Sequence, residues 1–202
     1  MTIAIIDTGS ANLNSVMQAI KRLGFEAFIS SDVKEIDKAS HLILPGVGTA
    51  GAVMDGVLKF GLKDFILNTR KPLLGICLGM QVLATDSSEV KLNSEDKVVK
   101  ALGIIDSHVK KLEAHGERLP HMGWNTVEHN NHPLFEGIKN NAYFYFDHSF
   151  AMEVNKDSIG ITEYGQKFTA ACAHNNFMGV QFHPEKSSEA GEKLLLNFIH
   201  NF

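Results

Sequence analysis

The thiol of Cys77 lies between two glycines in the pentapeptide GICLG, residues 75–79, after an apolar run and before an expected helix. Glycine-x-nucleophile-x-glycine in this context is typical of a nucleophile elbow, a strained turn with room only for glycine at its flanks. The start of the helix would favour the thiolate, and the N–H of Leu78 would point at an oxyanion on the attacked carbon. Free cysteine is also among the most buried residue types. The pentapeptide alone therefore favours a reactive thiol and a merely buried one about equally.

A thiol nucleophile needs a base, and the segment QFHPEKSS, residues 181–188, offers one. His183 and Glu185 lie two residues apart at the end of an apolar strand, which places them on the same side of an extended chain. Pro184 fixes its own φ and disfavours helix at His183. The carboxylate could then bind one imidazole nitrogen and leave the other for the thiol. Alone, the segment favours a capping turn before the last helix; beside an elbow cysteine, it favours a catalytic base.

A third segment, LPGVG at residues 44–48, ends an expected strand in a glycine loop. Its backbone can approach a ligand closely and donate N–H groups. In chain order it is placed to face Cys77 across the carboxyl ends of adjacent strands, where doubly wound sheets bind ligands. The alternative is a simple turn between a strand and a helix.

Other candidate residues are weaker. Cys172 alternates with small residues in an expected strand and has no basic neighbour, which predicts a buried, inert thiol. His121, His129 and His132 lack the paired spacing of a zinc site, so no metal is expected. Trp124 in PHMGWN is either a core plug or a protein-interface anchor, and physical arguments alone slightly favour the core plug.

The elements that position these segments alternate between strand and helix in the first half of the chain. Strands are expected at TIAIID, FEAFIS, HLILPG and PLLGI. Helices are expected near residues 12–23, with Asn12 as N-cap, and at residues 33–38, 52–60 and 62–69. A further helix is expected to start at LGMQVLA. Such alternation predicts a parallel sheet covered on both faces. The second half offers the short strands IDSHVKKL, YFYF, SIGITEY, FTAACAH and FMGVQF, expected as antiparallel additions, and a closing helix. Residues 85–100 are expected to be the least ordered.

Composition sets the class of protein. A chain of 202 residues predicts a single α/β domain over residues 1–202. A net charge of −4 without long basic runs argues against nucleic-acid and membrane surfaces. Without a signal peptide or a disulfide framework, a cytoplasmic protein is expected.

Together, GICLGMQ, FHPEKS and PGVG resemble the class I, triad-type glutamine amidotransferases. PHMGWN, YFDHSF and GVQFHPEKSS narrow the resemblance to the glutamine-hydrolysing subunits of imidazole glycerol phosphate synthase, over essentially the whole chain. This resemblance implies a flavodoxin-like fold with a mixed, mostly parallel sheet, no cofactor, and a separate (β/α)₈-barrel cyclase as heterodimer partner. It also implies that Cys77 is the nucleophile, His183 the general base and acid, and Glu185 the residue that orients His183.

The resemblance assigns further roles. The implied oxyanion hole consists of Leu78, Val47 and Gly48; the implied glutamine contacts are Gln81, Glu89, His148, Ser149 and Phe150; and the implied interface residues are Met122, Trp124, Tyr145 and Lys186.

Two positions depart from the pattern of this family. Asp147 stands where an apolar residue is usual, and Ala50 where phenylalanine is common. Two alternatives stay open: a glutaminase of the same architecture, such as the subunit of pyridoxal phosphate synthase or a free-standing hydrolase, and a non-catalytic binding domain. PHMGWN and the intact Cys, His and Glu set argue against them.

Overall fold

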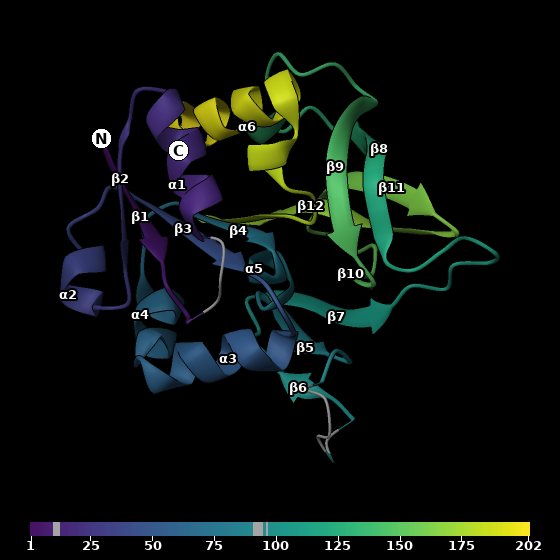
Figure 1. Ribbon diagram of the computed structural model, residues 1–202, viewed down its shortest axis with the longest axis horizontal. Helices are drawn as coiled ribbons and strands as arrows, with labels where there is room; N and C mark the ends of the chain where they lie inside the picture. The colour runs from purple at the N-terminus through teal and green to yellow at the C-terminus, as the bar shows by residue number, and fades with distance from the viewer. Residues whose placement is uncertain (10–12, 91–94, 96) are drawn as a thin grey trace.

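A central sheet with helices on both faces organises the molecule (Figure 1). The structure is a computed structural model that describes residues 1–9, 13–90, 95 and 97–202. Within these residues the sheet has the strand order β2-β1-β3-β4-β13-β12-β11-β8-β9. Its parallel part contains β2 (Glu26–Ser30), β1 (Thr2–Ile6), β3 (His41–Gly46), β4 (Leu73–Cys77) and β13 (Phe177–Val180). Its antiparallel part contains β12 (Gln166–His174), β11 (Ser158–Tyr164), β8 (His121–His129) and β9 (Ala142–His148).

A smaller sheet lies beside the central one. Its strand order is β10-β7-β5-β6, with bounds Phe150–Met152, Ile105–Lys111, Ala84–Ser87 and Val99–Lys100. A single residue, Ser149, separates Ala142–His148 (β9) from β10. The chain therefore passes from the central sheet to the smaller one within one short turn.

The helices form two layers because successive residues of a buried strand point to opposite faces. On one face, α1 (Leu13–Arg22) and α6 (Ser188–Asn201) pack over Ile3 and Ile5 of β1. On the other, α3 (Ala50–Lys59) and α4 (Leu62–Asn68) pack over Ala4 and Ile6. Shorter helices are α2 (Val33–Ile36), α5 (Leu78–Gln81), η1 (Pro133–Phe135) and η2 (Pro184–Lys186).

The expected α/β class and mixed sheet are confirmed, with four differences in detail. β13 was expected to be antiparallel, but it pairs in parallel with β4 and is antiparallel only to β12. The helix expected from LGMQVLA is one turn, α5, because β5 begins at Ala84. β5 and β6 were not expected, and they occupy the ends of the segment 85–100, which is expected to be the least ordered. β8 and β10 were not expected, and the predicted N-cap Asn12 lies outside the described residues.

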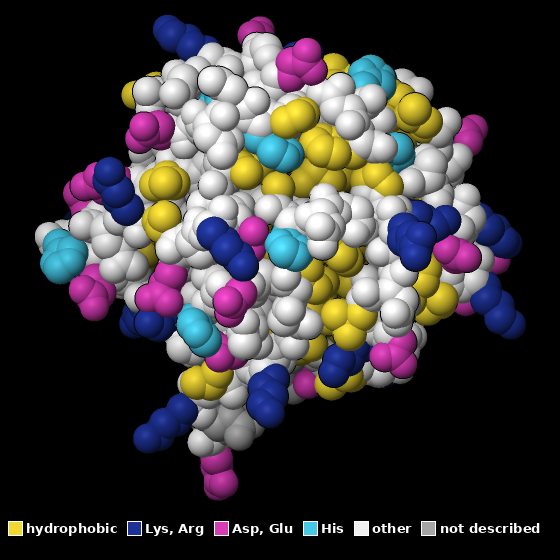
Figure 2. All heavy atoms as spheres, turned by 180° about the vertical axis from the view of Figure 1, so that it is seen from behind, with side chains coloured by type: hydrophobic (Ala, Val, Ile, Leu, Met, Phe, Trp, Pro, Cys, Tyr) yellow, Lys and Arg dark blue, Asp and Glu magenta, His cyan; other side chains and the backbone are white. Residues whose placement is uncertain are grey.

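Charges of both signs are spread over the surface. On the face that Figure 2 shows, basic and acidic side chains are interspersed rather than separated by sign. In the described part of the chain, no helix is long and apolar enough to cross a membrane.

Candidate active site

Cys77 stands at the carboxyl end of β4, between two parallel neighbours. In the sheet register, Gly46 of β3 lies opposite Cys77, and Val180 of β13 lies opposite Ile76. The glycine loop after β3 and the His183 segment after β13 therefore leave the sheet on either side of the thiol. This is the edge at which open α/β sheets bind ligands.

The turn at Cys77 has the geometry of an elbow. Cys77 adopts φ 53° and ψ −109°, a conformation that L-residues rarely occupy. A Cβ on Gly75 would lie 2.6 Å from the carbonyl oxygen of Gly79, and one on Gly79 would lie 1.6 Å from that of Leu44. Only glycine fits at the two flanks, as the pentapeptide predicted, because backbone packs against backbone on both sides.

His183 is held by Glu185 beside the thiol. Its Nδ1 lies 2.8 Å from Glu185 Oε1, and the two side chains are 10% and 4% exposed. Burial lowers the pKa of His183, but its bonds to Cys77 and Glu185 outweigh burial and raise the pKa above the ordinary value. The chain from His183 to Glu185 is not extended as predicted, because the 3₁₀ turn η2 begins at Pro184, directly after His183. The interpretation of His183 as a solvated capping residue is wrong.

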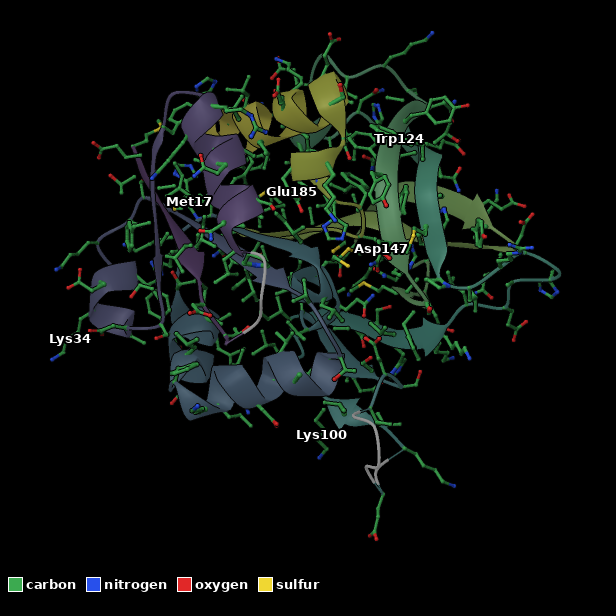
Figure 3. The ribbon with its side chains drawn as sticks, viewed as in Figure 1. Met17, Lys34, Lys100, Trp124, Asp147 and Glu185 are labelled. Atoms are coloured by element: carbon green, nitrogen blue, oxygen red, sulfur yellow. The ribbon has the colours of Figure 1, made fainter. Side chains whose placement is uncertain are left out.

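A cavity of about 330 Å³ opens in front of Cys77. In Figure 3, Asp147 on β9 and Glu185 before α6 both lie near this region at the centre of the molecule. The cavity is lined by Gly46, Val47, Gly48, Cys77, Leu78, Gln81, Glu89, Asp147, His148, Ser149, Phe150, His183 and Lys186. The structure thus brings all the predicted oxyanion and substrate residues to the nucleophile. Gly46, Asp147 and Lys186 also line the cavity; Lys186 was assigned to the interface, and Asp147 was noted only as a departure.

Buried polar groups form one wall of this cavity. Gln81 Nε2 donates to the carbonyl of Phe150 at 2.8 Å and to Oε1 of Gln181 at 3.0 Å. Nε2 of Gln181 in turn donates to Cys77 Sγ at 3.6 Å. Gln81 Oε1 is buried and has no hydrogen-bond partner among the described residues. Sequence reasoning missed Gln181, although an amide within the apolar run GVQF is a signal of a buried polar role.

Glu89 is a second unsatisfied acceptor. Burial raises its pKa to about 7, and a bond from the backbone N–H of Ala50 opposes this shift. Its Oε2 has no hydrogen-bond partner among the described residues. Ala50 itself is fully buried at the start of α3. A ligand cation that reached Glu89 would restore the charged carboxylate.

His148 lines the cavity, and His121 lies behind it. His148 Nδ1 lies 2.9 Å from the Phe150 carbonyl, and its Nε2 lies 3.2 Å from His121 Nδ1. Burial lowers the pKa of His148 to about 3 and that of His121 to about 4. Both rings are therefore neutral at pH 7, each with one donor and one acceptor nitrogen. The Phe150 carbonyl accepts from both His148 and Gln81, which fixes its direction.

The outer face of β8 and β9 carries exposed apolar and aromatic side chains, with Asp147 opposite Met122. Met122 and Trp124 are 61% and 52% exposed, so the preference for a core plug is wrong. In register, Trp124 lies opposite Tyr145, with ring centroids 6.1 Å apart, and Lys186 Nζ lies 5.5 Å above the Tyr145 ring. Figure 3 shows Trp124 on this pair of strands. Lys186 joins this face to the cavity, because it belongs to both.

The remaining candidates lie away from the cavity. Cys172 is fully buried in β12, and burial raises the pKa of its thiol to about 12, as expected of an inert residue. His129 accepts from the N–H of Asn131, and His132 accepts from Leu134 as the N-cap of η1. Within the described residues, no three His, Cys, Asp or Glu side chains form a group that could hold a metal ion.

Comparison with known families agrees with this geometry. The family described as "Glutamine amidotransferase class-I" matches residues 4–202. The chain belongs to this family. The resemblance stated from GICLGMQ and FHPEKS is thereby confirmed, and with it the expectation of an enzyme.

Within the glutamine amidotransferases, the chain is similar to one kind of subunit. It is 50% identical over 198 residues to imidazole glycerol phosphate synthase subunit HisH of Vibrio cholerae serotype O1, covering 98% of this chain and 97% of that one. It is 52% identical over 200 residues to subunit HisH 2 of Campylobacter jejuni strain RM1221, covering 98% of each. The amidotransferase is thus a HisH-type subunit of histidine biosynthesis, as the narrower resemblance predicted.

Solved structures support the fold alone. A protein of Thermoplasma acidophilum that is described as part of a GMP synthase superposes with a TM-score of 0.76 at 20% identity, covering 98% of this chain and 92% of that one. PurLQS from Thermotoga maritima gives a TM-score of 0.73 at 16% identity, covering 99% and 98%. The amidotransferase architecture is therefore shared at low sequence identity.

Proposed function

We propose that this chain hydrolyses glutamine at Cys77 and passes the ammonia to a separate cyclase subunit, which makes imidazole glycerol phosphate and AICAR. One observation carries the proposal. The thiol of Cys77 and the imidazole of His183 line one cavity, and the carboxylate of Glu185 holds that imidazole from behind. A thiol, a base and an orienting carboxylate are the parts of nucleophilic amide hydrolysis.

In the proposed reaction, His183 takes the thiol proton of Cys77, and the sulfur attacks the side-chain amide carbon of glutamine. The carbonyl electron pair moves to oxygen, and the oxyanion is received by N–H groups of Leu78 and the loop at Val47 and Gly48. His183 then protonates the amide nitrogen, the C–N bond breaks, and ammonia leaves a glutamyl thioester. Water, deprotonated by His183, hydrolyses the thioester and returns the thiol. Glu185 orients the ring and stabilises its charged form throughout.

The substrate's head group is assigned to the unsatisfied acceptors of the cavity. The ammonium of glutamine would bind Oε2 of Glu89 and Oε1 of Gln81, two oxygens that lack partners among the described residues. The backbone of residues 148–150 would contact the same part of the substrate, because these residues line the same cavity. Since β4 and β10 of different sheets both contribute to it, we treat residues 1–202 as one catalytic domain.

A partner follows from the fate of ammonia. Near pH 7 ammonia released into water is mostly protonated and loses its nucleophilicity, so it must pass to its acceptor through a protected path. The exposed Met122 and Trp124 lie beside Tyr145 and form an apolar patch with two charged neighbours, Lys186 at the cavity and Asp147 opposite Met122. We assign this face to a (β/α)₈-barrel cyclase in a heterodimer, and a cytoplasmic location stays a prediction.

The decisive experiment uses the assembled complex and two cysteine variants. Cys77→Ala should abolish glutamine hydrolysis, yet the complex should still make imidazole glycerol phosphate from added ammonium salts. Cys172→Ala, which changes the other buried thiol, should retain glutamine hydrolysis. Glutaminase activity that survives Cys77→Ala would eliminate the proposed mechanism.

A further inference from the structure

The nucleophile has a neighbour that the triad does not account for. Gln181 is fully buried two residues before His183, and its Nε2 lies 3.6 Å from the sulfur of Cys77. We propose that the side-chain amide of Gln181 donates a hydrogen bond to the thiolate of Cys77, and that Gln81 fixes the direction of this amide. This inference rests on the proposed glutaminase function and adds a catalytic residue to it.

The orientation of the amide follows from its partners. The carbonyl oxygen of Phe150 can only accept, so the Gln81 atom 2.8 Å away must be its NH₂ group. The second hydrogen of that group points to Gln181, 3.0 Å away, which must therefore present its oxygen. The NH₂ group of Gln181 is then left facing the sulfur. Since His148 also donates to Phe150, the carbonyl at the origin of this chain is held from two sides.

The alternative neighbours of the sulfur do not replace this donor. The carbonyl oxygen of Asp147 lies 4.0 Å from Sγ and can accept from a thiol, but it repels a thiolate. His183 must give up its proton to the leaving nitrogen during the reaction. Gln181 keeps its hydrogens at every stage, so it can stabilise the sulfur anion both before attack and when the thioester breaks. A bond to an ionised acceptor in a buried site is among the stronger hydrogen bonds in proteins.

The backbone holds Gln181 in place independently of the side chain. Gln181 follows β13 directly, and its N–H donates to the carbonyl of Ala170 at 2.8 Å. Cys77 is equally fixed by its elbow. The donor and the sulfur therefore come from two neighbouring strand ends, and neither depends on a mobile side chain of the surface.

Two substitutions in the assembled complex test the donor. Gln181→Met removes it at similar volume, and Gln181→Glu keeps an acceptor for Gln81 but turns an oxygen toward the sulfur. We expect the pH profile of Cys77 alkylation by iodoacetamide, followed by mass spectrometry of its peptide, to move up by about one to two pH units in Gln181→Met. The shift should be larger in Gln181→Glu. The kcat/KM for glutamine should fall about ten-fold to a hundred-fold in Gln181→Met and further in Gln181→Glu, mainly in kcat.

A matched control separates this effect from loss of stability. Asn197 is also a buried amide, and it donates to the carbonyls of Leu134 and Glu136 away from the cavity. Asn197→Leu should lower the midpoint of thermal unfolding and leave the alkylation profile unchanged. If Gln181→Met does not fold, Gln181→Asn, which withdraws the donor by one methylene, takes its place.

The outcomes are distinguishable from those of the function itself. An unchanged alkylation profile in folded Gln181→Met or Gln181→Asn overturns the donor role, even if activity falls. Alkylation reports on the thiol without glutamine turnover, so it does not depend on the substrate being correct. Persistent turnover in Cys77→Ala would instead overturn the proposed function.

Discussion

Replacing Glu185 by glutamine removes one charge from the orienting position and leaves the side-chain shape nearly unchanged. Oε1 of Glu185 lies 2.8 Å from Nδ1 of His183, in a side chain that is 4% exposed. At an effective dielectric constant of about 20, two unit charges at this separation attract by about 6 kcal/mol. The amide keeps a hydrogen bond worth about 1 kcal/mol. Burying a neutral amide also costs less than burying a carboxylate, which offsets a further part of the lost attraction. The imidazolium of His183 should therefore lose about 3–5 kcal/mol of stabilisation.

This loss should appear as a fall of about 10²–10⁴ in kcat/KM for glutamine, measured with the assembled complex. The pH dependence should change as well. Glu185 raises the pKa of His183, so the imidazolium is present below that raised value and is lost as the pH rises through it. Without Glu185, the alkaline limb of the kcat/KM profile should move to lower pH.

The control is Glu189→Gln, an exposed carboxylate in the first turn of α6. It should change neither the rate nor the profile. A Glu185→Gln complex with kcat/KM within ten-fold of the unmodified complex, and with the same alkaline limb, would refute the assignment of Glu185 as the group that holds the imidazolium.

Three further predictions use other parts of the site. Gly79→Ala should destabilise the fold by more than about 3 kcal/mol in urea unfolding, because its Cβ would meet the carbonyl of Leu44; near-normal stability would mean that the elbow can relax. Since burial raises the pKa of Glu89 to about 7, the carboxylate is lost as the pH falls below that value, and the KM for glutamine should rise. Glu89→Gln should have a high KM at every pH. A KM that still depends on pH in this variant would exclude Glu89 as the cause. Trp124→Ala should weaken partner binding about thirty-fold or more in calorimetry and cost about 1 kcal/mol or less in stability, whereas Leu58→Ala, an equally exposed apolar residue on α3, should leave binding unchanged. Equal losses in the two variants would remove Trp124 from the interface.

The sequence predicted the parallel half of the fold because its signals are local. Apolar runs such as TIAIID and HLILPG lie between turn residues, and each became a strand buried on both faces. β8 was missed because its pattern is reversed: Met122 and Trp124 point outward, and His121 is buried beneath them. A hydrophobic periodicity rule places such residues on the wrong side of a strand. Exposed apolar residues on a strand thus resemble a core face in the sequence.

The site was predictable where a motif is short and self-contained. The glycines at 75 and 79 and the His183–Glu185 pair are such cases, since each depends on neighbours within a few residues. An amide in the apolar run GVQF indicates a buried polar residue, but the partners of Gln181 were not predictable, because its contacts with Gln81 and Cys77 join residues about a hundred positions apart. The parallel pairing of β13 was missed for the same reason, as strand direction depends on which strand is the neighbour.

The position of β13 has a consequence for how the enzyme is made. This strand is synthesised last, yet it lies in the middle of the central sheet, between β4 and β12. A chain still growing on the ribosome therefore carries the elbow and its thiol long before His183 exists to activate it, and it has two apolar strand edges open at the gap. Pairing of β13 with β4 and β12 covers these edges and brings His183 to the thiol. Chains that lack residues 177–185 are therefore expected to expose these edges and, under the proposed mechanism, to hydrolyse no glutamine.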